Sequence, residues 1–413
     1  MQSAMTLKSG EVVRFSEVTL PASKSESNRA LMIAAYGGFT PELENLSDSK
    51  DTLVLKKALN CLPFIDSCQR TIPSGNDIKG KQRTIDIADC GTAARFMATY
   101  LACHEGNWHL TGTERMCQRP MAPLVKALRS LGADIQYIGN DGCLPLRIQG
   151  RPIEGGKTSI DMTQSSQFAS SLLLASPMWP QGLELELVGT PNSLPYLDMT
   201  ISMMCHFSAQ VERRDGVVLV KPQPYQNQPF TVESDWSAAS YWYEMAAFSE
   251  ECVIKMRGLS TLRQTQGSRP AQGDAIIAEW MTQLGVGTFV ENEGIVLRKI
   301  PFEKHTLHFD FSQHPDLYPT MAVTCAGLGV EAFFTGLENL SIKESDRVVA
   351  MREELEKLDK GSVRFCAHND HRVVMALAPL SMLVGPIVFD HPEVVEKSYP
   401  GFWDDVSFLP VQV

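Results

Sequence analysis

The sequence predicts an α/β fold with two similar domains, each made of three repeated helix-and-short-strand units around buried helices. Two observations predict this architecture: a helix-to-strand pattern recurs along the chain, and six polar clusters each lead into an apolar helix. The length of 413 residues agrees with it, because a chain of this length exceeds one typical domain.

The helix-to-strand pattern is a helix, then leucine or phenylalanine, a small or turn residue, and a short strand, as in "ALRSLGADI" and "WMTQLGVGTF". The copies recur roughly 75 residues apart, which indicates repeated structural units. Three copies continue into a predicted hairpin whose turn ends at Gly142, Gly216 or Gly294. The residue after the leucine or phenylalanine in successive copies is Pro63, Gly132, Ser208, Gly285 or Asp359.

The six apolar helices begin in "SKSESNRALMIAAY", "DCGTAARFMATYLA", "SSQFASSLLLAS", "SDWSAASYWYEMAAF", "HPDLYPTMAVTCAGL" and "NDHRVVMALAPLSML". Each is rich in small and apolar residues on every side, which is typical of a buried helix. Two bundles of three would bury all six. We therefore expect the polar clusters at their N-termini to face a shared cleft.

The first of these helices has a predicted start at Ser23, which with Glu26 has the form of a capping box. Gly37 and Gly38 supply the predicted end. Lys24, Ser25 and Arg29 then lie at a helix N-terminus, where the helix dipole and exposed N–H groups favour anions. A solvated, capped helix start is the alternative for this stretch taken alone.

The composition restricts the function classes. A formal net charge of −11 argues against a nucleic-acid or anionic-membrane partner held by bulk charge. The ten cysteines are scattered, without a C-x-x-C pair or a Cys/His cluster at zinc spacing, so we expect reduced, mostly buried thiols. The N-terminus lacks an apolar signal core, and we expect a soluble, cytoplasmic protein.

Further cations and small hydroxyls gather in short motifs: "DCGTAAR", "RMCQRPM", "SSQF", "NLSIKESDR" and "NDHR", the last with His371 and Arg372. Each motif alone is more often structural, as a cap or a solvated charge. Together with "LPASKSESNRAL", "SLPYLDMT", "PD" and the late Lys397, they occur in the order and at spacings similar to those of the enolpyruvyl transferase family. The chain resembles in particular the branch that acts on shikimate 3-phosphate, along nearly its whole length.

This resemblance implies two domains that close over the substrates, with the chain crossing between them twice. We place one domain, with the shikimate 3-phosphate contacts, at residues 19–234. The other, with the acid/base and phosphoenolpyruvate contacts, comprises residues 1–18 and 235–413. The implied reaction moves the enolpyruvyl group of phosphoenolpyruvate to the 5-hydroxyl of shikimate 3-phosphate and releases phosphate, as a step toward aromatic amino acids, without cofactor or metal. We expect a monomer, and the resemblance also implies inhibition by glyphosate.

Site residues follow from the resemblance by matched position. The catalytic residues implied are Asp316, Glu344 and Lys24, which would protonate the methylene carbon and deprotonate the 5-hydroxyl in an order that stays open. Shikimate 3-phosphate would contact Lys24, Ser25, Arg29, Ser165, Ser166, Gln167, Ser193, Tyr196, Asp316, Asn339 and Lys343. Phosphoenolpyruvate would contact Lys24, Gly91, Arg119, Arg347, Arg372 and Lys397, with glycine at 91 because a side chain would crowd the ligand.

Two alternatives and several departures qualify this interpretation. The sister enzyme acting on UDP-N-acetylglucosamine typically has a reactive cysteine where this chain has Glu114, and Cys117 is only two residues before Arg119. A non-catalytic anion-binding repeat protein would not need Asp316 or Glu344. The chain departs from the family pattern at Asp89, Cys90 and Phe96. It also lacks a hairpin between Glu354 and His371, which we expect to be structural and to leave the strand around Val363 at a sheet edge.

Overall fold

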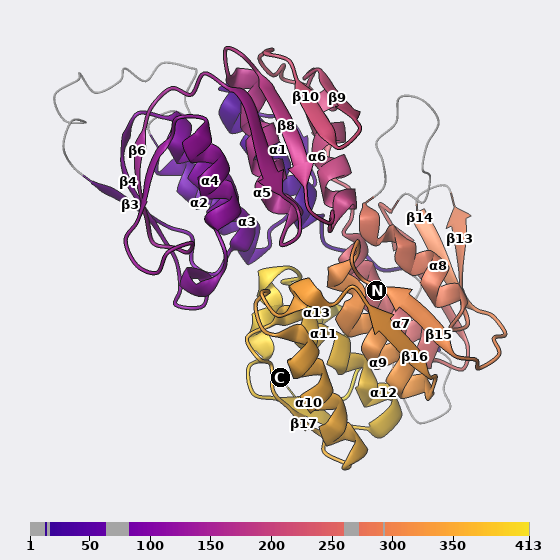
Figure 1. The fold of residues 1–413 in the computed structure, drawn as a ribbon. Helices are drawn as coiled ribbons and strands as arrows, with labels where there is room; N and C mark the ends of the chain where they lie inside the picture. Colours follow the sequence, from indigo (N-terminus) through magenta and orange to yellow (C-terminus); the bar gives the residue numbers. More distant parts are fainter. Residues whose placement is uncertain (1–12, 15–16, 63–81, 260–271, 292–293, 413) are drawn as a thin grey trace.

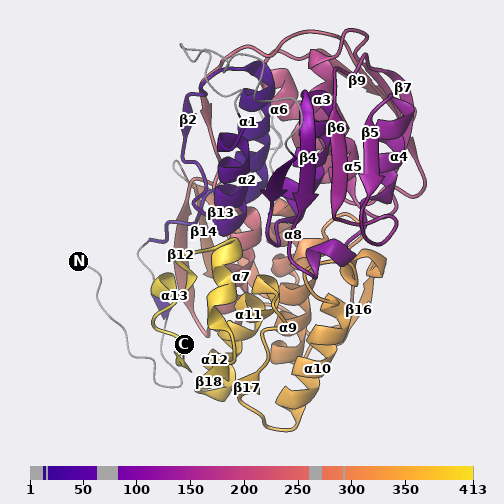
Figure 2. The ribbon, with the colours of Figure 1, turned by 90° about the vertical axis from the view of Figure 1, so that its left-hand side faces the viewer.

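The structure is a computed structural model that describes residues 13–14, 17–62, 82–259, 272–291 and 294–412. The chain forms two lobes, one indigo to magenta and one orange to yellow (Figure 1). The first and last described strands, β1 (Val13–Arg14) and β19 (Val411–Gln412), both belong to the second lobe, which the described chain leaves once and re-enters once. A quarter turn shows the helices α1 to α6 in the upper lobe and α7 to α13 in the lower one (Figure 2).

Three of the repeated units contain a four-stranded sheet with the same strand order. In each sheet the first two strands are parallel and the last two form an antiparallel pair. The first sheet, in order, is β3 (Arg83–Asp86), β4 (Gly106–Thr111), β6 (Leu146–Gly150) and β5 (Asp134–Tyr137). The second is β7 (Gly156–Asp161), β8 (Leu183–Val188), β10 (Val217–Val220) and β9 (Val211–Arg214). The third is β1 (Val13–Arg14), β12 (Cys252–Arg257), β14 (Gly294–Lys299) and β13 (Val286–Glu291).

These sheets confirm the predicted hairpins and repeat units. Gly142 and Gly216 have positive φ angles of 84° and 78° in the connections β5–β6 and β9–β10, a backbone conformation that glycine adopts without strain. The first unit has only β2 (Leu43–Glu44) paired with β11 (Phe230–Thr231). Its predicted pattern at Pro63 lies outside the described residues.

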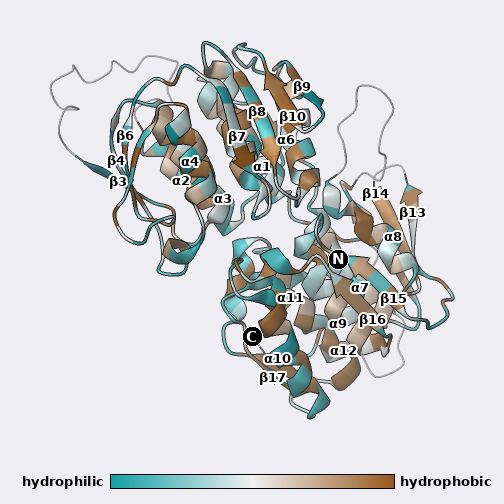
Figure 3. Cartoon of the chain, in the orientation of Figure 1, coloured by the Kyte–Doolittle hydropathy of each residue, from teal (hydrophilic) through white to brown (hydrophobic). Residues whose placement is uncertain are grey.

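The six predicted buried helices form two sets of three, and the three helices of each set pack against one another. The first set is α1 (Lys24–Gly37), α3 (Gly91–Cys103) and α5 (Ser166–Ala175), and the second is α7 (Trp236–Phe248), α9 (Tyr318–Leu328) and α11 (His371–Leu377). The outer helices are α2 (Lys50–Asn60), α4 (Ala122–Ser130), α6 (Leu194–His206), α8 (Ile277–Thr282), α10 (Arg347–Asp359), α12 (Ser381–Val384) and α13 (Phe402–Asp405). Figure 3 shows this difference in hydropathy: the outer α10 carries teal turns, whereas α9 behind it is pale or brown.

Each lobe has its own hydrophobic core. One core is built from residues between positions 22 and 232, and the other from residues 18 and 20 together with residues between 236 and 409. Leu20 packs in the second core and Ala22 in the first. The division into domains at 19 and 234 remains a prediction, since independent folding has not been measured.

The two crossings between the lobes run side by side. Ala22 and Ser234 form an antiparallel bridge. The Ser23 N–H donates to Glu233 O at 2.8 Å, and the Asp235 N–H donates to Pro21 O at 2.9 Å. The lobes are therefore joined by a hydrogen-bonded pair of segments that leads directly into α1 and α7.

The start of α1 confirms half of the predicted capping box. Ser23 is the N-cap, and its Oγ accepts from the Glu26 N–H at 3.4 Å. The reciprocal half is wrong: the Glu26 carboxylate accepts from the Glu233 N–H at 2.9 Å. The second crossing segment occupies the groups that a capping box would join. The predicted end is confirmed by Gly38, which caps α1 in the left-handed conformation.

The fifth unit confirms the missing hairpin. Its sheet has only β15 (Leu307–Asp310) and β16 (Ala332–Thr335). After α10 the chain enters β17 (Arg364–Phe365), which lies at the edge of a sheet with β18 (Ile387–Phe389) and β19 (Val411–Gln412). The predicted edge strand is therefore present, and it belongs to the sixth unit.

The thiols differ from expectation. Of the described cysteines, only Cys90, Cys252 and Cys325 are buried, while Cys61 and Cys205 are exposed. The prediction of mostly buried thiols is wrong, because several cysteines lie at helix ends and in connections. No helix in the described part of the chain has the length and apolar composition of a bilayer-spanning segment.

Candidate active site

Polar side chains from both lobes line one cavity of ≈ 70 Å³. All predicted catalytic and substrate-binding residues line it, except Asn339 and Lys397. Asp51, Thr92 and His371 line it without having been predicted as site residues. Ligand pockets usually measure roughly 300–1,000 Å³, so this cavity is smaller than a typical ligand pocket.

Five of the six buried helices direct their starts at this cavity. Lys24 begins α1, Gly91 begins α3, Ser166 begins α5 and His371 begins α11. Asp316 lies in the short 3-10 turn that precedes α9. The start of α7 does not line the cavity, but Ser237 in its first turn accepts from Arg372 Nη2 at 3.4 Å. Five of the six polar clusters therefore line the cavity, as expected. The sixth, at the start of α7, lies behind Arg372.

Arg29 is a buried cation surrounded by neutral oxygens. Its Nε donates to Thr200 Oγ1 at 2.7 Å, Nη1 to Ser25 O at 2.8 Å and Nη2 to Tyr196 O at 3.2 Å. In the described part of the chain no carboxylate oxygen lies within 4.0 Å of its guanidinium. Burial lowers the pKa of Arg29 to about 10, so the side chain stays charged near neutral pH.

Neutral donors lie beside Arg29 in the same lobe. Ser165 Oγ accepts from the Gln167 N–H at 3.2 Å and caps α5. The Gln167 side-chain amide donates to Thr92 Oγ1 at 3.2 Å. Ser193 has a left-handed backbone with φ 57°, and its N–H donates to Ser312 O in the other lobe at 2.9 Å.

Arg347 and Arg372 are instead paired with carboxylates. Arg347 donates to Asp316 Oδ1 at 2.9 Å, to Glu344 Oε2 at 3.0 Å and to Asp370 Oδ2 at 2.8 Å. Arg372 Nη2 donates to Asp316 Oδ2 at 2.7 Å. Such buried charge-assisted contacts hold both partners ionised.

The two predicted acid/base residues are therefore ionised. Burial alone would raise the pKa of Asp316, but Arg372 and Lys343 outweigh it and hold the pKa well below its usual value. Burial likewise opposes ionisation of Glu344, whose pKa Arg119 and Arg347 hold well below its usual value.

Lys397 does not reach the cavity because three oxygens of the first lobe hold it. Its Nζ donates to Asp51 Oδ1 at 3.0 Å, to Asp89 Oδ2 at 2.9 Å and to Asp89 O at 3.0 Å. Lys24 Nζ donates to the other oxygen of Asp51 at 3.0 Å. Burial opposes ionisation of Asp51, but Lys24 and Lys397 lower its pKa. Asp89, a departure from the family pattern, is thus a partner of Lys397.

Asn339 also lies outside the cavity and joins the lobes. Its Nδ2 donates to Thr163 O at 2.8 Å. Arg115 binds the same segment from the other lobe, donating to the carbonyls of Ser341, Lys343 and Glu344 at 2.9–3.2 Å. The segment that carries Glu344 is therefore fixed against the first lobe.

Asp274 is a buried acid that sequence reasoning missed. Its Oδ2 accepts from Ser237 Oγ and, at 3.5 Å, from the Tyr196 hydroxyl, which also donates to Asp316 Oδ2 at 3.1 Å. Its Oδ1 has no hydrogen-bond partner among the residues that the structure describes. Burial, with the nearby charge of Asp316, raises the pKa of Asp274 to about 7.

His371 lines the cavity, and neither of its ring nitrogens has a hydrogen-bond partner in the described part of the chain. The carboxylate of Asp370 lies 3.6 Å from Nδ1, which is too long for a hydrogen bond. Burial and the cations Lys24 and Arg372 hold the pKa of His371 well below its usual value. The neutral ring can therefore donate or accept toward a bound molecule.

Gly91 is constrained by a different neighbour from the one expected. A Cβ at this position would lie 2.7 Å from Arg119 Nη1. The predicted crowding therefore acts first on Arg119, which lies 3.6 Å from the Glu344 carboxylate.

Comparison with known proteins identifies one family for this chain. The family model described as EPSP synthase (3-phosphoshikimate 1-carboxyvinyltransferase) matches residues 14–406. A 3-phosphoshikimate 1-carboxyvinyltransferase of Bacteroides fragilis strain YCH46 is 42% identical over 410 residues, covering 94% of each chain. The enzyme of the same name from Methanoculleus marisnigri is 32% identical, covering 93% of this chain and 94% of the relative.

Solved structures show the same fold. The EPSP synthase of Acinetobacter baumannii matches with a TM-score of 0.70 at 19% identity, covering 98% of this chain and 97% of that one. The enolpyruvyl transferase NikO from Streptomyces tendae matches with a TM-score of 0.64 at 13% identity, covering 97% and 96%.

Proposed function

This chain belongs to the EPSP synthase family, and we propose that it is a 3-phosphoshikimate 1-carboxyvinyltransferase. It transfers the enolpyruvyl group of phosphoenolpyruvate to the 5-hydroxyl of shikimate 3-phosphate and releases phosphate. The observation that carries the proposal is the single cavity in which Arg29, Arg119, Arg347 and Arg372 meet Asp316 and Glu344. Two anionic substrates need such a density of cations, and proton transfer needs the two acids.

Shikimate 3-phosphate binds on the first-lobe side of the cavity. Arg29 supplies a charge that no carboxylate neutralises in the described chain, and Ser165, Ser166 and Gln167 add neutral donors. Tyr196 and Ser193 complete this wall, while Lys343 and Asn339 approach from the other lobe. An anion here gains charge-assisted hydrogen bonds without displacing an acid.

Phosphoenolpyruvate binds where Arg119, Arg347 and Arg372 converge, next to Gly91. These arginines contact Asp316 and Glu344, so the phosphate and carboxylate of the substrate compete with those acids. Lys397 joins the site only if its contacts with Asp51 and Asp89 rearrange. Substrate binding therefore reorganises charge on this side.

The acid/base roles follow from this competition. Asp316 is an ionised carboxylate and accepts the proton of the 5-hydroxyl. Glu344 loses part of its contact with Arg119 and Arg347 when phosphoenolpyruvate binds, so its pKa rises and it takes up the proton that it donates to the methylene carbon. Oxygen attack on the adjacent carbon gives a tetrahedral intermediate, which expels phosphate and loses a methyl proton to restore the double bond. Lys24, at the start of α1, stabilises charge on both substrates.

The sister activity on UDP-N-acetylglucosamine has less support. The family of this chain is that of the shikimate enzyme, and Cys117 Sγ faces Gly112 O at 3.5 Å rather than the cavity. A non-catalytic binding protein would not need the two ionised acids beside four arginines.

One assay tests these functions together. Phosphate release from phosphoenolpyruvate is measured with shikimate 3-phosphate, with UDP-N-acetylglucosamine, and with neither. We expect release only with shikimate 3-phosphate. Release with the nucleotide sugar, or with neither acceptor, contradicts the proposal.

The remaining proposals concern the whole protein. The domains comprise residues 19–234 and residues 1–18 with 235–413, and they move relative to each other when the substrates bind. The protein acts as a monomer, because both walls of the cavity come from one chain. It works in the cytoplasm, where phosphorylated substrates occur and where thiols stay reduced. Sedimentation and small-angle scattering with and without both substrates test the oligomeric state and the domain movement.

A further inference from the structure

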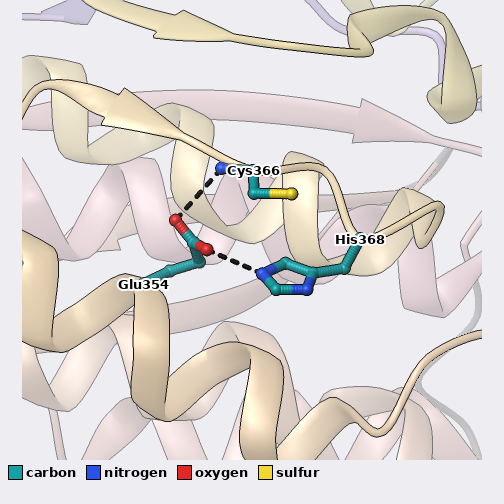
Figure 4. A group of neighbouring side chains, drawn as sticks. All are labelled: Glu354, Cys366 and His368. Carbon is teal, nitrogen blue, oxygen red and sulfur yellow. Dashed lines mark hydrogen bonds and ion pairs between the residues drawn. The ribbon is translucent and has the colours of Figure 1, made fainter.

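The connection between α10 and α11, where the hairpin is absent, gathers three side chains with metal-binding chemistry. Glu354 lies on α10, Cys366 follows β17, and His368 lies just before α11. Figure 4 shows one carboxylate oxygen of Glu354 pointing at a ring nitrogen of His368, with the Cys366 thiol nearby. This group is outside the candidate active site.

The three potential ligand atoms are close together. Glu354 Oε1 lies 2.6 Å from His368 Nε2, and Oε2 accepts from the Cys366 N–H at 3.1 Å. One carboxylate oxygen, the imidazole nitrogen and the Cys366 sulfur all lie within 4.8 Å of one another. The Glu354 side chain is 0% exposed, so a bound ion would be shielded from water on one side.

From this cluster we propose a zinc site in which Cys366 Sγ, His368 Nε2 and one oxygen of Glu354 bind Zn²⁺, with water as the fourth ligand. Zinc takes sulfur, nitrogen and oxygen ligands together in tetrahedral sites. The carboxylate-to-imidazole hydrogen bond must open to about 3.3 Å, the ligand separation that zinc bond lengths of about 2.0–2.1 Å impose. The thiol releases its proton to solvent, and the imidazole carries its proton on Nδ1.

The alternative is that these side chains form a network of hydrogen bonds and ion pairs that binds no metal. Lys357 Nζ lies 2.7 and 2.9 Å from the two Glu354 oxygens and supplies a competing positive charge. Its side chain is 41% exposed, so it can leave Glu354 for solvent when an ion arrives. The two alternatives therefore differ in what they predict when the lysine charge is removed. The zinc site predicts tighter metal binding, whereas a network without metal does not.

Groups around the thiol also bear on the site. The Cys366 thiol contacts the Asp390 carboxylate, whose Oδ1 accepts from the Ala367 N–H at 2.7 Å. Burial, together with Asp390 and Glu354, raises the pKa of the Cys366 thiol. A divalent cation reverses this balance, because it favours the thiolate over the thiol.

The zinc ion would act as a structural cross-link. It would tie α10 to the segment that enters α11, and Asp370 in that segment caps α11 and binds Arg347. Three other units carry a hairpin, β5–β6, β9–β10 or β13–β14, where this short connection carries the cluster. Binding a metal only to the folded protein stabilises it.

The direct test is a titration of the full-length, metal-free protein with Co²⁺ followed by absorption spectroscopy. We expect one equivalent to give a thiolate-to-cobalt charge-transfer band and tetrahedral visible bands, and Zn²⁺ to displace it. Cys366→Ser should abolish the charge-transfer band, and His368→Gln should weaken binding roughly a hundredfold. The matched control Cys205→Ser removes an exposed thiol elsewhere and should change neither band.

Lys357→Met separates the zinc site from a metal-free network. The proposal expects tighter cobalt binding, because a competing cation is removed. Weaker binding in this variant, absence of a one-to-one cobalt spectrum, or a spectrum unchanged by Cys366→Ser would each overturn the proposal. Thermal unfolding gives a second readout: Zn²⁺ should raise the midpoint of the native protein and leave that of Cys366→Ser unchanged.

Discussion

Arg29 and Arg347 are both buried arginines of one cavity, but they have opposite surroundings. Arg29 is held by three neutral oxygens, whereas Arg347 binds three carboxylates. An anion can join Arg29 without displacing an acid, while an anion that joins Arg347 must compete with Asp316 and Glu344. In the proposed mechanism, the Arg29 side of the site therefore accepts its ligand without breaking an ion pair, and the Arg347 side couples ligand binding to proton uptake.

The largest expected effect comes from breaking the coupled side. Glu344→Gln keeps the shape of the side chain but removes the proton donor, so turnover should fall about 10²–10⁴-fold. Shikimate 3-phosphate binding, measured by calorimetry, should be retained. Glu338→Gln is the matched control, because Glu338 is exposed on the same segment. Turnover close to that of the native protein would remove Glu344 from the acid role.

Removing the cation on the Arg29 side should have the next largest effect. Arg29→Ala loses charge-assisted hydrogen bonds of about 1.5–3 kcal/mol to a bound anion, so the affinity for shikimate 3-phosphate should fall roughly 10- to 100-fold. Calorimetry measures this loss, with the exposed Arg213→Ala as control. An affinity equal to that of the native protein would show that Arg29 only supports the fold through Thr200.

Asp274 is a third buried titratable group, and unlike Asp316 it has no cation within 4.0 Å among the described residues. Its pKa of about 7 is above the unfolded value of about 3.9, so the folded protein binds the proton more tightly. This contribution to the free energy of unfolding therefore grows as the pH falls from 7 toward 4 and disappears above 7.

Asp274→Asn tests this sign by urea unfolding at several pH values. The native protein should gain on the order of 2 kcal/mol from this group between pH 7 and pH 5, and the variant should lack that gain. Asp198→Asn, at a half-exposed acid that pairs with Arg213, is the control. Equal pH profiles for native protein and Asp274→Asn would place the pKa near its ordinary value.

The smallest expected effect is at Gly91, where the two sides meet. The Cβ of Gly91→Ala would lie 2.7 Å from Arg119 Nη1 and would force that side chain to shift, so the KM for phosphoenolpyruvate should rise by up to about tenfold. Glyphosate inhibition should weaken more than substrate binding, and shikimate 3-phosphate affinity should be unchanged. Gly401→Ala is the control, because a Cβ there would meet only Asp405 Oδ2, at 3.8 Å. An equal loss for glyphosate and phosphoenolpyruvate would contradict the steric argument.

The features that could be predicted from the sequence are those with a local sequence pattern. The start of α1 at Ser23, the six buried helices and the basic motifs at their N-termini all have signals within a few residues. Asp51 and Asp274 were missed because their partners lie far along the chain, at Lys397 and Tyr196. The reciprocal half of the capping box failed for the same reason, since Glu233 supplies the competing backbone groups.

The cluster of Glu354, Cys366 and His368 shows the same limit. Cys366 and His368 are two positions apart, but the third group is one helix upstream, so no metal-binding spacing is visible in the sequence. Only the return of the chain from α10 to β17 brings the carboxylate to the imidazole. The prediction that the site contains no metal concerns the catalytic cavity and is not tested by this cluster.

The paired crossing segments have a mechanical consequence. Two linker segments without contacts to each other would let the lobes twist and slide. Here the two segments are joined by hydrogen bonds from Ser23 to Glu233 and from Asp235 to Pro21. They therefore behave as one two-stranded linker that bends most easily about a single axis. The Asp235 carboxylate also accepts from the Lys24 N–H at 3.3 Å, so the linker ends at the first residue of α1. Any flexing of this hinge therefore moves Lys24 directly, and the motion of the lobes and the position of a proposed catalytic lysine share one degree of freedom.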